Sequence, residues 1–109
     1  MEQNTLQKLY DVVVNRKENP EEGSYTCYLF GEGMDKILKK VGEESAEVII
    51  AAKNKETMPL VGEVSDLLYH LMVLLAEADI PYALVEEELN TRAQKIGNLK
   101  EMKQVDKNS

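Results

Sequence analysis

Two pairs of acidic residues are the part of the sequence best suited to chemistry. Glu44 and Glu47 are three residues apart, and so are Glu63 and Asp66 further along the chain. Residues three apart lie on the same face of an α-helix. If the two segments pack together, the four carboxylates meet and repel one another unless a cation neutralises them. Oxygen ligands suit a hard ion, so the pattern predicts a site for Mg²⁺, or Mn²⁺.

Such a site indicates phosphoryl chemistry, because magnesium keeps part of its water shell and takes its remaining ligands from substrate phosphates. Glu43 or Glu47 could orient a water molecule or accept its proton. The alternative interpretation is an ordinary solvated helix face, on which Lys40–Glu44 and Lys39–Glu43 form i,i+4 ion pairs. The second acidic pair on the adjoining segment strengthens the case for a metal site, and both interpretations stay open on these residues alone.

Basic residues close to these acids could hold substrate phosphates. Lys36, Lys39 and Lys40 lie one to two helical turns before Glu44, and Arg16 lies near the end of the first apolar segment. A lysine cluster of this kind can bind phosphate groups as point charges. Taken singly, each of these residues is equally typical of a salt-bridged helix surface.

A run of hydroxyl-bearing residues follows a break in the helical pattern at residues 18–23. Ser24, Tyr25 and Thr26 would place hydroxyls and backbone N–H groups at the start of a short helix, which is a natural anion site. Ser24 suits simple helix capping equally well. His70 is interpreted as a packed or surface residue. Because it is the single histidine of the sequence, the Glu-x-x-His repeats of di-iron bundles are excluded.

The elements that position these residues are expected to be helices. Apolar residues recur at the spacing of a helix face at residues 5–17, 34–54 and 81–96. A short helix is expected at 24–30, after a possible Ser24 cap, and a long apolar helix at 58–78. Asn4 or Thr5 can cap the first segment and Thr57 the fourth. Gly31 and Gly33 should separate the short helix from the one that follows.

The segment 58–78 is apolar around most of its circumference, which is typical of a central helix in a bundle. Short connections make neighbouring helices antiparallel, so 34–54 and 58–78 should form a hairpin that brings the two acidic faces together. We expect an all-α antiparallel bundle of about four long helices. The central helix has more apolar surface than its partners in one chain can cover, so the core should be completed by homodimerisation.

Length and charge limit the classes of function. The 109 residues fit one domain, expected over residues 1–97, followed by a polar and flexible tail at 98–109. The net charge of −7 argues against nucleic-acid binding, which depends on Lys and Arg at phosphates. There is no signal-peptide pattern, and the longest apolar stretch, 67–76, is too short to span a bilayer, so we expect no membrane contact and a cytoplasmic location.

Taken together, these residues resemble a known family. The resemblance lies at four places, which are Ser24-Tyr25-Thr26, Gly33, KKVGEE at 39–44 with Glu47, and EVSDLLYH at 63–70. At these places the chain is similar to the phosphoribosyl-ATP pyrophosphohydrolases of histidine biosynthesis. The resemblance covers roughly residues 5–95, and KKVGEE with the upstream SYT is its most specific part. The two acidic pairs alone mark a wider superfamily of all-helical nucleotide pyrophosphohydrolases that resemble MazG and the dimeric dUTPases.

The resemblance implies hydrolysis of 1-(5-phosphoribosyl)-ATP to 1-(5-phosphoribosyl)-AMP and pyrophosphate, with magnesium and a homodimeric helical bundle. It also implies that a separate phosphoribosyl-AMP cyclohydrolase acts next. Residue by residue, it assigns the metal to Glu44, Glu47, Glu63 and Asp66. Glu43 matches a neighbouring acid that could assist the water or bind a second ion, so the expected catalytic residues are Glu43 and Glu47. The expected substrate-binding residues are Arg16, Ser24, Tyr25, Thr26, Lys36, Lys39 and Lys40.

Two other functions fit part of the pattern. One is a house-cleaning pyrophosphohydrolase of the same superfamily that acts on free NTPs or dNTPs, which the SYT segment disfavours. The other is a non-enzymatic helical dimer that binds partner proteins. It would explain the apolar central helix and the charged surface, but not two matched acidic pairs meeting across one hairpin.

Overall fold

The protein is helical throughout the part of the chain that the structure describes. The computed structural model describes residues 4–95 and residue 100. Within those residues there are five helices and no strand: α1 (Thr5–Glu18), α2 (Tyr25–Glu32), α3 (Met34–Lys53), α4 (Thr57–Glu77) and α5 (Tyr82–Ala93). The expected all-α class is therefore confirmed, whereas the expected tail at 98–109 lies outside the described residues apart from residue 100.

The first two helices begin where the sequence offers a capping side chain. The Asn4 side chain accepts a hydrogen bond from the backbone N–H of Gln7 at 2.8 Å. The Ser24 hydroxyl accepts one from the backbone N–H of Cys27 at 3.1 Å. Each of these bonds satisfies an N–H group that the helix cannot pair internally, which explains why both starts could be predicted closely.

Two expected boundaries are wrong in detail. Gly31 lies inside α2, and Gly33 alone separates α2 from α3. The φ of Gly33 is 95°, a left-handed conformation that glycine adopts without steric cost. Thr57 is the first residue of α4 and does not cap it, because the capping position belongs to Glu56, whose side chain makes no capping hydrogen bond.

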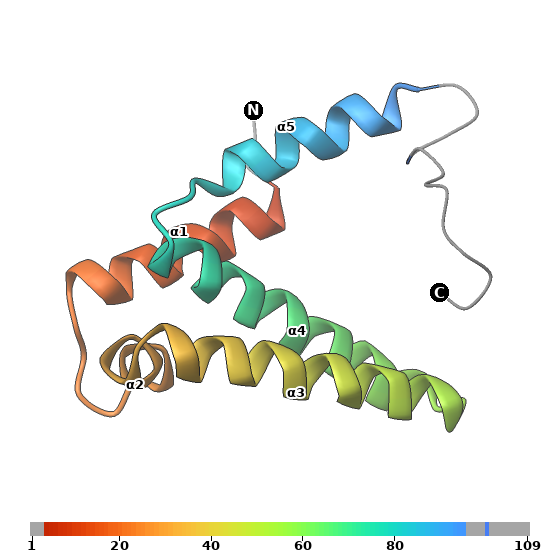
Figure 1. Cartoon of the computed structure of the whole chain (residues 1–109), viewed down its shortest axis with the longest axis horizontal. Helices are drawn as coiled ribbons and strands as arrows, with labels where there is room; N and C mark the ends of the chain where they lie inside the picture. Colours follow the sequence, from red (N-terminus) through yellow and green to blue (C-terminus); the bar gives the residue numbers. More distant parts are fainter. Residues whose placement is uncertain (1–3, 96–99, 101–109) are drawn as a thin grey trace.

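Helices α3 and α4 lie side by side as an antiparallel hairpin, and the other helices gather around one end of it (Figure 1). Helices α1 and α2 both pack against α4, and α5 packs back against α1. The buried core lies where these helices meet, and it consists of Val13, Leu29, Ile37, Met72, Val73, Ala76 and Tyr82. This arrangement anchors the hairpin that carries both acidic pairs.

One lysine links α1 to the C-terminal end of α4. The ammonium group of Lys17 donates a hydrogen bond to the carbonyl oxygen of Ala76 at 3.2 Å and lies 3.3 Å from a carboxylate oxygen of Glu77. A cation at a helix C-terminus pairs with unsatisfied carbonyl groups and interacts favourably with the helix dipole. The contact therefore fixes the end of α4 against α1.

The far end of the hairpin leaves apolar side chains exposed. Met58 is 71% exposed and Ile49 is 63% exposed. We call this surface the apolar strip, defined as Ile49, Ile50, Met58, Val61 and Val64. Helix α4 was expected to be the central helix of the bundle. Within one chain, this holds for the C-terminal half of α4, where its buried residues lie.

Helix α4 is also the one helix, within the described residues, that is long and apolar enough to cross a membrane. Length and composition alone give this result, and the core helix of a soluble bundle passes the same test. The carboxylates of Glu63 and Asp66 on the same helix are costly in a lipid environment. The composition of α4 is equally suited to a helix that packs against protein on several sides.

Candidate active site

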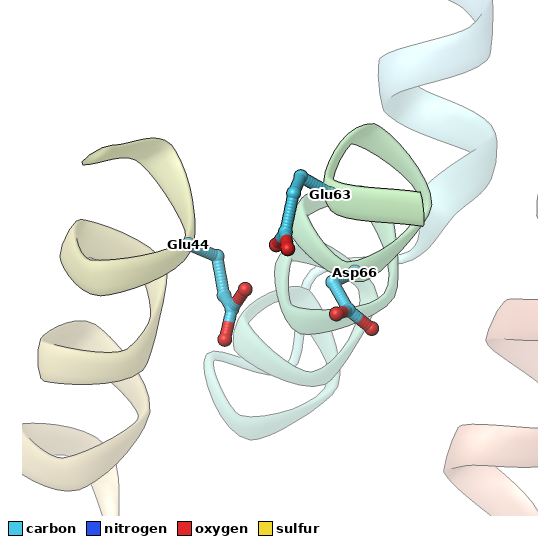
Figure 2. Close-up of side chains that lie close together, drawn as sticks. All are labelled: Glu44, Glu63 and Asp66. Carbon is cyan, nitrogen blue, oxygen red and sulfur yellow. The ribbon is translucent and has the colours of Figure 1, made fainter. Parts of the chain in front are cut away.

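Three carboxylates converge between α3 and α4. Glu44 extends from α3, and Glu63 and Asp66 extend from α4 into the same space (Figure 2). One carboxylate oxygen from each residue lies within 4.8 Å of the other two. The predicted hairpin therefore brings acids from both helices together, as the i,i+3 spacing indicated.

Two oxygen atoms of this group lack a partner of any kind. Glu44 is only 6% exposed, and one of its carboxylate oxygens is buried without a hydrogen bond. One oxygen of Glu63 is in the same condition. Burying a charged oxygen without a partner is unfavourable, and a divalent cation would satisfy both oxygens and neutralise the group. The donor set, which is all carboxylate, fits a hard ion such as magnesium.

Glu47 lies next to this group but is not one of the three converging acids. Its main effect is on Glu63, because a side-chain hydrogen bond with Glu47 is the largest cause that raises the pKa of Glu63. That hydrogen bond raises the pKa of Glu63 above its usual value, and partial burial and the negative charges of Glu47, Glu44 and Asp66 raise it further. The neighbouring acids therefore oppose ionisation of Glu63, and a cation bound between them would relieve that repulsion.

Lys40 places a positive charge at the edge of the site. Its ammonium group lies 3.5 Å from a carboxylate oxygen of Glu43 and 3.6 Å from one of Glu44. Burial acts to lower the pKa of Lys40, but Tyr25, Glu43 and Glu44 outweigh it, so the pKa is raised. The expected Lys40–Glu44 pair is confirmed, whereas within the described residues Glu43 pairs with Lys40 and not with Lys39.

The other predicted phosphate-binding residues make contacts of their own. The guanidinium of Arg16 lies 3.6 Å from a carboxylate oxygen of Glu21, in the connection that precedes α2. The ammonium group of Lys36 lies over the ring of Tyr28, 5.9 Å from its centroid. Lys39 is exposed on α3. Of the four predicted basic residues, the structure brings Lys40 into direct contact with the converging carboxylates.

The three hydroxyl-bearing residues connect α2 to its own backbone and to α4. Ser24 caps α2, as one of its two interpretations predicted. The Tyr25 hydroxyl lies 3.0 Å from Nε2 of His70. The Thr26 hydroxyl is hydrogen-bonded to the hydroxyl of Tyr69. These bonds position the start of α2 beside the part of α4 that follows the acidic pair.

His70 and Tyr69 are the members of the site that the sequence analysis did not include. His70 was interpreted as a packed or surface residue, and it is packed, at 3% exposed. Its Nδ1 lies 2.7 Å from the backbone carbonyl oxygen of Asp66, one helical turn earlier. The four-residue spacing from Asp66 to His70 was a usable signal, because such residues share one helix face.

A helical hairpin that brings carboxylates from two helices together fits the MazG-like, all-helical nucleotide pyrophosphohydrolases, the superfamily that contains the matching family. The model of one family within this class, described as "Phosphoribosyl-ATP pyrophosphohydrolase", matches residues 6–93. The chain belongs to this family.

Curated relatives agree with the family match over nearly the whole chain. A protein of Listeria monocytogenes serotype 4a (strain HCC23) is 55% identical over 92% of this chain and 96% of its own length. One of Clostridium botulinum (strain Kyoto / Type A2) is 52% identical over 95% of this chain and 96% of its own length. One of Limosilactobacillus fermentum is 54% identical over 92% and 94%, respectively. Each of the three is named phosphoribosyl-ATP pyrophosphatase.

Proposed function

We propose that this chain hydrolyses 1-(5-phosphoribosyl)-ATP to 1-(5-phosphoribosyl)-AMP and pyrophosphate, as an enzyme of histidine biosynthesis. The observation that carries the proposal is the identity of 51–55% to relatives named for this activity, over most of both chains. The convergence of Glu44, Glu63 and Asp66 supports it, because a group of carboxylates able to hold a cation suits a substrate rich in phosphates.

Magnesium is part of this proposal, with Glu44, Glu63 and Asp66 as the residues that would hold it and Glu47 beside them. When bound, the ion would offset the negative charge of the phosphates and make water a better nucleophile. Glu47 or Glu43 orients the water and accepts its proton. The water oxygen forms a bond to phosphorus, the α–β phosphoanhydride bond breaks, and pyrophosphate leaves with the electron pair of that bond. Lys40 stabilises the charge that grows on the phosphoryl oxygens.

The working protein in this proposal is a cytoplasmic homodimer. The apolar strip supports the dimer, because several large apolar side chains exposed near one end of the hairpin are typical of an interaction site. A second copy would cover the half of α4 that one chain leaves exposed. In this proposal, a separate phosphoribosyl-AMP cyclohydrolase then consumes the product.

A pyrophosphate-release assay tests the proposal directly. The substrates to compare are phosphoribosyl-ATP, ATP and several dNTPs, each with magnesium and with a chelator. We expect release from phosphoribosyl-ATP at a kcat/KM at least about 100-fold above that for ATP, and no release with the chelator present. Equal release from the dNTPs would instead favour the house-cleaning function.

A further inference from the structure

Two tyrosine side chains form an exposed aromatic surface beside the carboxylates. The rings of Tyr25 and Tyr28 are stacked, with centroids 6.0 Å apart and an angle of 26° between their planes. Tyr25 is 46% exposed and Tyr28 is 47% exposed. We call this surface the tyrosine ledge. It is not explained by the hydrophobic core, because neither residue belongs to it.

Buried groups hold Tyr25 in place from the α4 side. A backbone carbonyl can only accept, so Nδ1 of His70 carries the proton in its hydrogen bond to Asp66. With that proton on Nδ1, Nε2 is the acceptor for the Tyr25 hydroxyl, which lies 3.0 Å away. The ring of Tyr69 lies 6.2 Å from that of Tyr25. The orientation of Tyr25 is therefore fixed, although nearly half of it remains open to a ligand.

The tyrosine ledge lies next to the charged part of the site. Burial is the main cause that raises the pKa of Tyr25, and the charges of Lys40, Glu44 and Lys36 also act on it. The ammonium group of Lys36 lies 5.9 Å from the centroid of the Tyr28 ring. A purine cation that stacks on the Tyr28 ring would therefore take the place of the Lys36 ammonium group. The hydrogen bonds from Tyr25 to His70 and from His70 to the backbone of Asp66 join the ledge to the acidic group.

We propose that the tyrosine ledge stacks on the purine of the substrate and selects an N1-substituted, positively charged adenine over the neutral adenine of ATP, with His70 as a positioning residue for Tyr25. This inference rests on the proposed function. Attachment of ribose at N1 makes adenine a stronger base, so that the purine of phosphoribosyl-ATP is protonated near neutral pH. The electron-rich face of tyrosine attracts such a cation and also stacks on a flat base.

The charge selectivity can be tested without the phosphoribosyl group. The probe is N1-methyl-ATP, whose purine is positively charged, compared with ATP as competing ligands in magnesium buffer. We expect the wild-type chain to bind N1-methyl-ATP about 2- to 30-fold more tightly than ATP. Tyr28→Leu should remove this difference, Tyr28→Phe should keep it because the ring face remains, and Leu84→Ala on α5, also exposed, should leave it unchanged.

Three outcomes would overturn the inference. The first is a wild-type chain that binds both ligands equally, and the second is a Tyr28→Leu variant that retains the preference. The third is a Tyr28→Leu variant whose oligomeric mass changes, because the ledge would then be a subunit contact. The proposed function fails by a different result, namely no pyrophosphate release from phosphoribosyl-ATP by the wild-type chain. Titration of the two ligands does not depend on turnover, so the two failures are distinguishable.

The positioning role of His70 is tested through Tyr25. Tyr25→Phe and His70→Asn should each raise KM for phosphoribosyl-ATP with little change in kcat. The double variant should be no worse than the single ones, because both break the same hydrogen bond. Additive effects on KM, or a loss confined to kcat, would contradict the role. Tyr25→Phe keeps the ring and the packing, so it remains informative if His70→Asn folds poorly.

Discussion

Glu47 differs from the other acids of the site in its surroundings. Glu44, Glu63 and Asp66 converge, whereas Glu47 lies beside them, is exposed and contacts the carboxyl group of Glu63. An exposed carboxylate at the edge of a cation site has access to water, which a proton acceptor needs. This position suits the predicted catalytic role of Glu47, whereas its predicted role as a metal ligand stays a prediction.

Replacing Glu47 by the isosteric Gln should therefore abolish turnover without unfolding the chain. The expected loss in kcat is about 10²- to 10⁴-fold, because Gln cannot accept the proton of water or carry the charge that a cation requires. Pyrophosphate release measures the loss, and far-UV circular dichroism should match that of the wild type. Glu87→Gln on α5 is the matched control, and retention of most activity by Glu47→Gln would refute its assignment.

The raised pKa of Glu63 predicts how stability depends on pH in the metal-free protein. A carboxyl group whose pKa is higher in the folded than in the unfolded state destabilises the fold when it is charged. That cost is present above the folded-state pKa, and it is relieved as the pH falls through that pKa towards the unfolded value. Glu63→Gln removes the cost at every pH.

In a chelator, Glu63→Gln should therefore have a higher Tm than the wild type at neutral pH, and the difference should shrink on acidification. Magnesium should raise the Tm of the wild type and have little effect on the variant, because binding to the folded state stabilises it. Thermal unfolding across a pH series measures both effects. A difference in Tm that grows as the pH falls would contradict the carboxyl–carboxyl contact.

At the residue scale, the sequence predicted which acids share a face but not their detailed contacts. The i,i+3 spacing places Glu44 and Glu47 on one side of α3, yet it does not determine which of them points at Asp66. Lys40 is within reach of residues three and four positions later, so its bond to Glu43 could not be distinguished from the expected Lys39–Glu43 pair. These choices depend on side-chain conformation and on tertiary packing.

The helices themselves were largely predictable, because apolar periodicity and capping residues are local signals. Helix α3 was expected at 34–54 and runs Met34–Lys53, and α4 was expected at 58–78 and runs Thr57–Glu77. The contacts between α2 and α4 could not be predicted in the same way. The hydroxyl of Tyr25 meets a residue 45 positions away, and no local pattern encodes that pairing.

The short helix α2 should depend strongly on its cap. Ser24→Ala should lower the free energy of unfolding by about 1 kcal/mol, because the N–H group of Cys27 loses its partner. Ser65→Ala is a matched control, because Ser65 is a solvent-exposed residue in the middle of α4, where alanine is the better helix former. Urea unfolding measures both variants. An equal effect of the two substitutions would show that the cap contributes nothing specific.

At the scale of the whole molecule, the apolar strip sets the expected assembly. Introducing lysine at both Ile49 and Met58 should convert a dimer into a folded monomer, because charges cannot be buried in an apolar contact without a partner. Sedimentation velocity measures the mass, and circular dichroism checks the fold. Val12→Lys on α1, a half-exposed apolar position outside the apolar strip, should leave the mass unchanged. A wild-type chain that is monomeric at micromolar concentration would refute the dimer.

The apolar strip lies on the same two helices as the carboxylates, so activity of the proposed dimer should depend on protein concentration. If protomers separate on dilution, the apolar strip becomes exposed to solvent at the end of the hairpin that does not pack against the core. The specific activity should then fall in nanomolar assays and recover with a lag when the sample is concentrated, because reassociation is a second-order process. Rate constants for this protein should accordingly be measured over a range of enzyme concentrations.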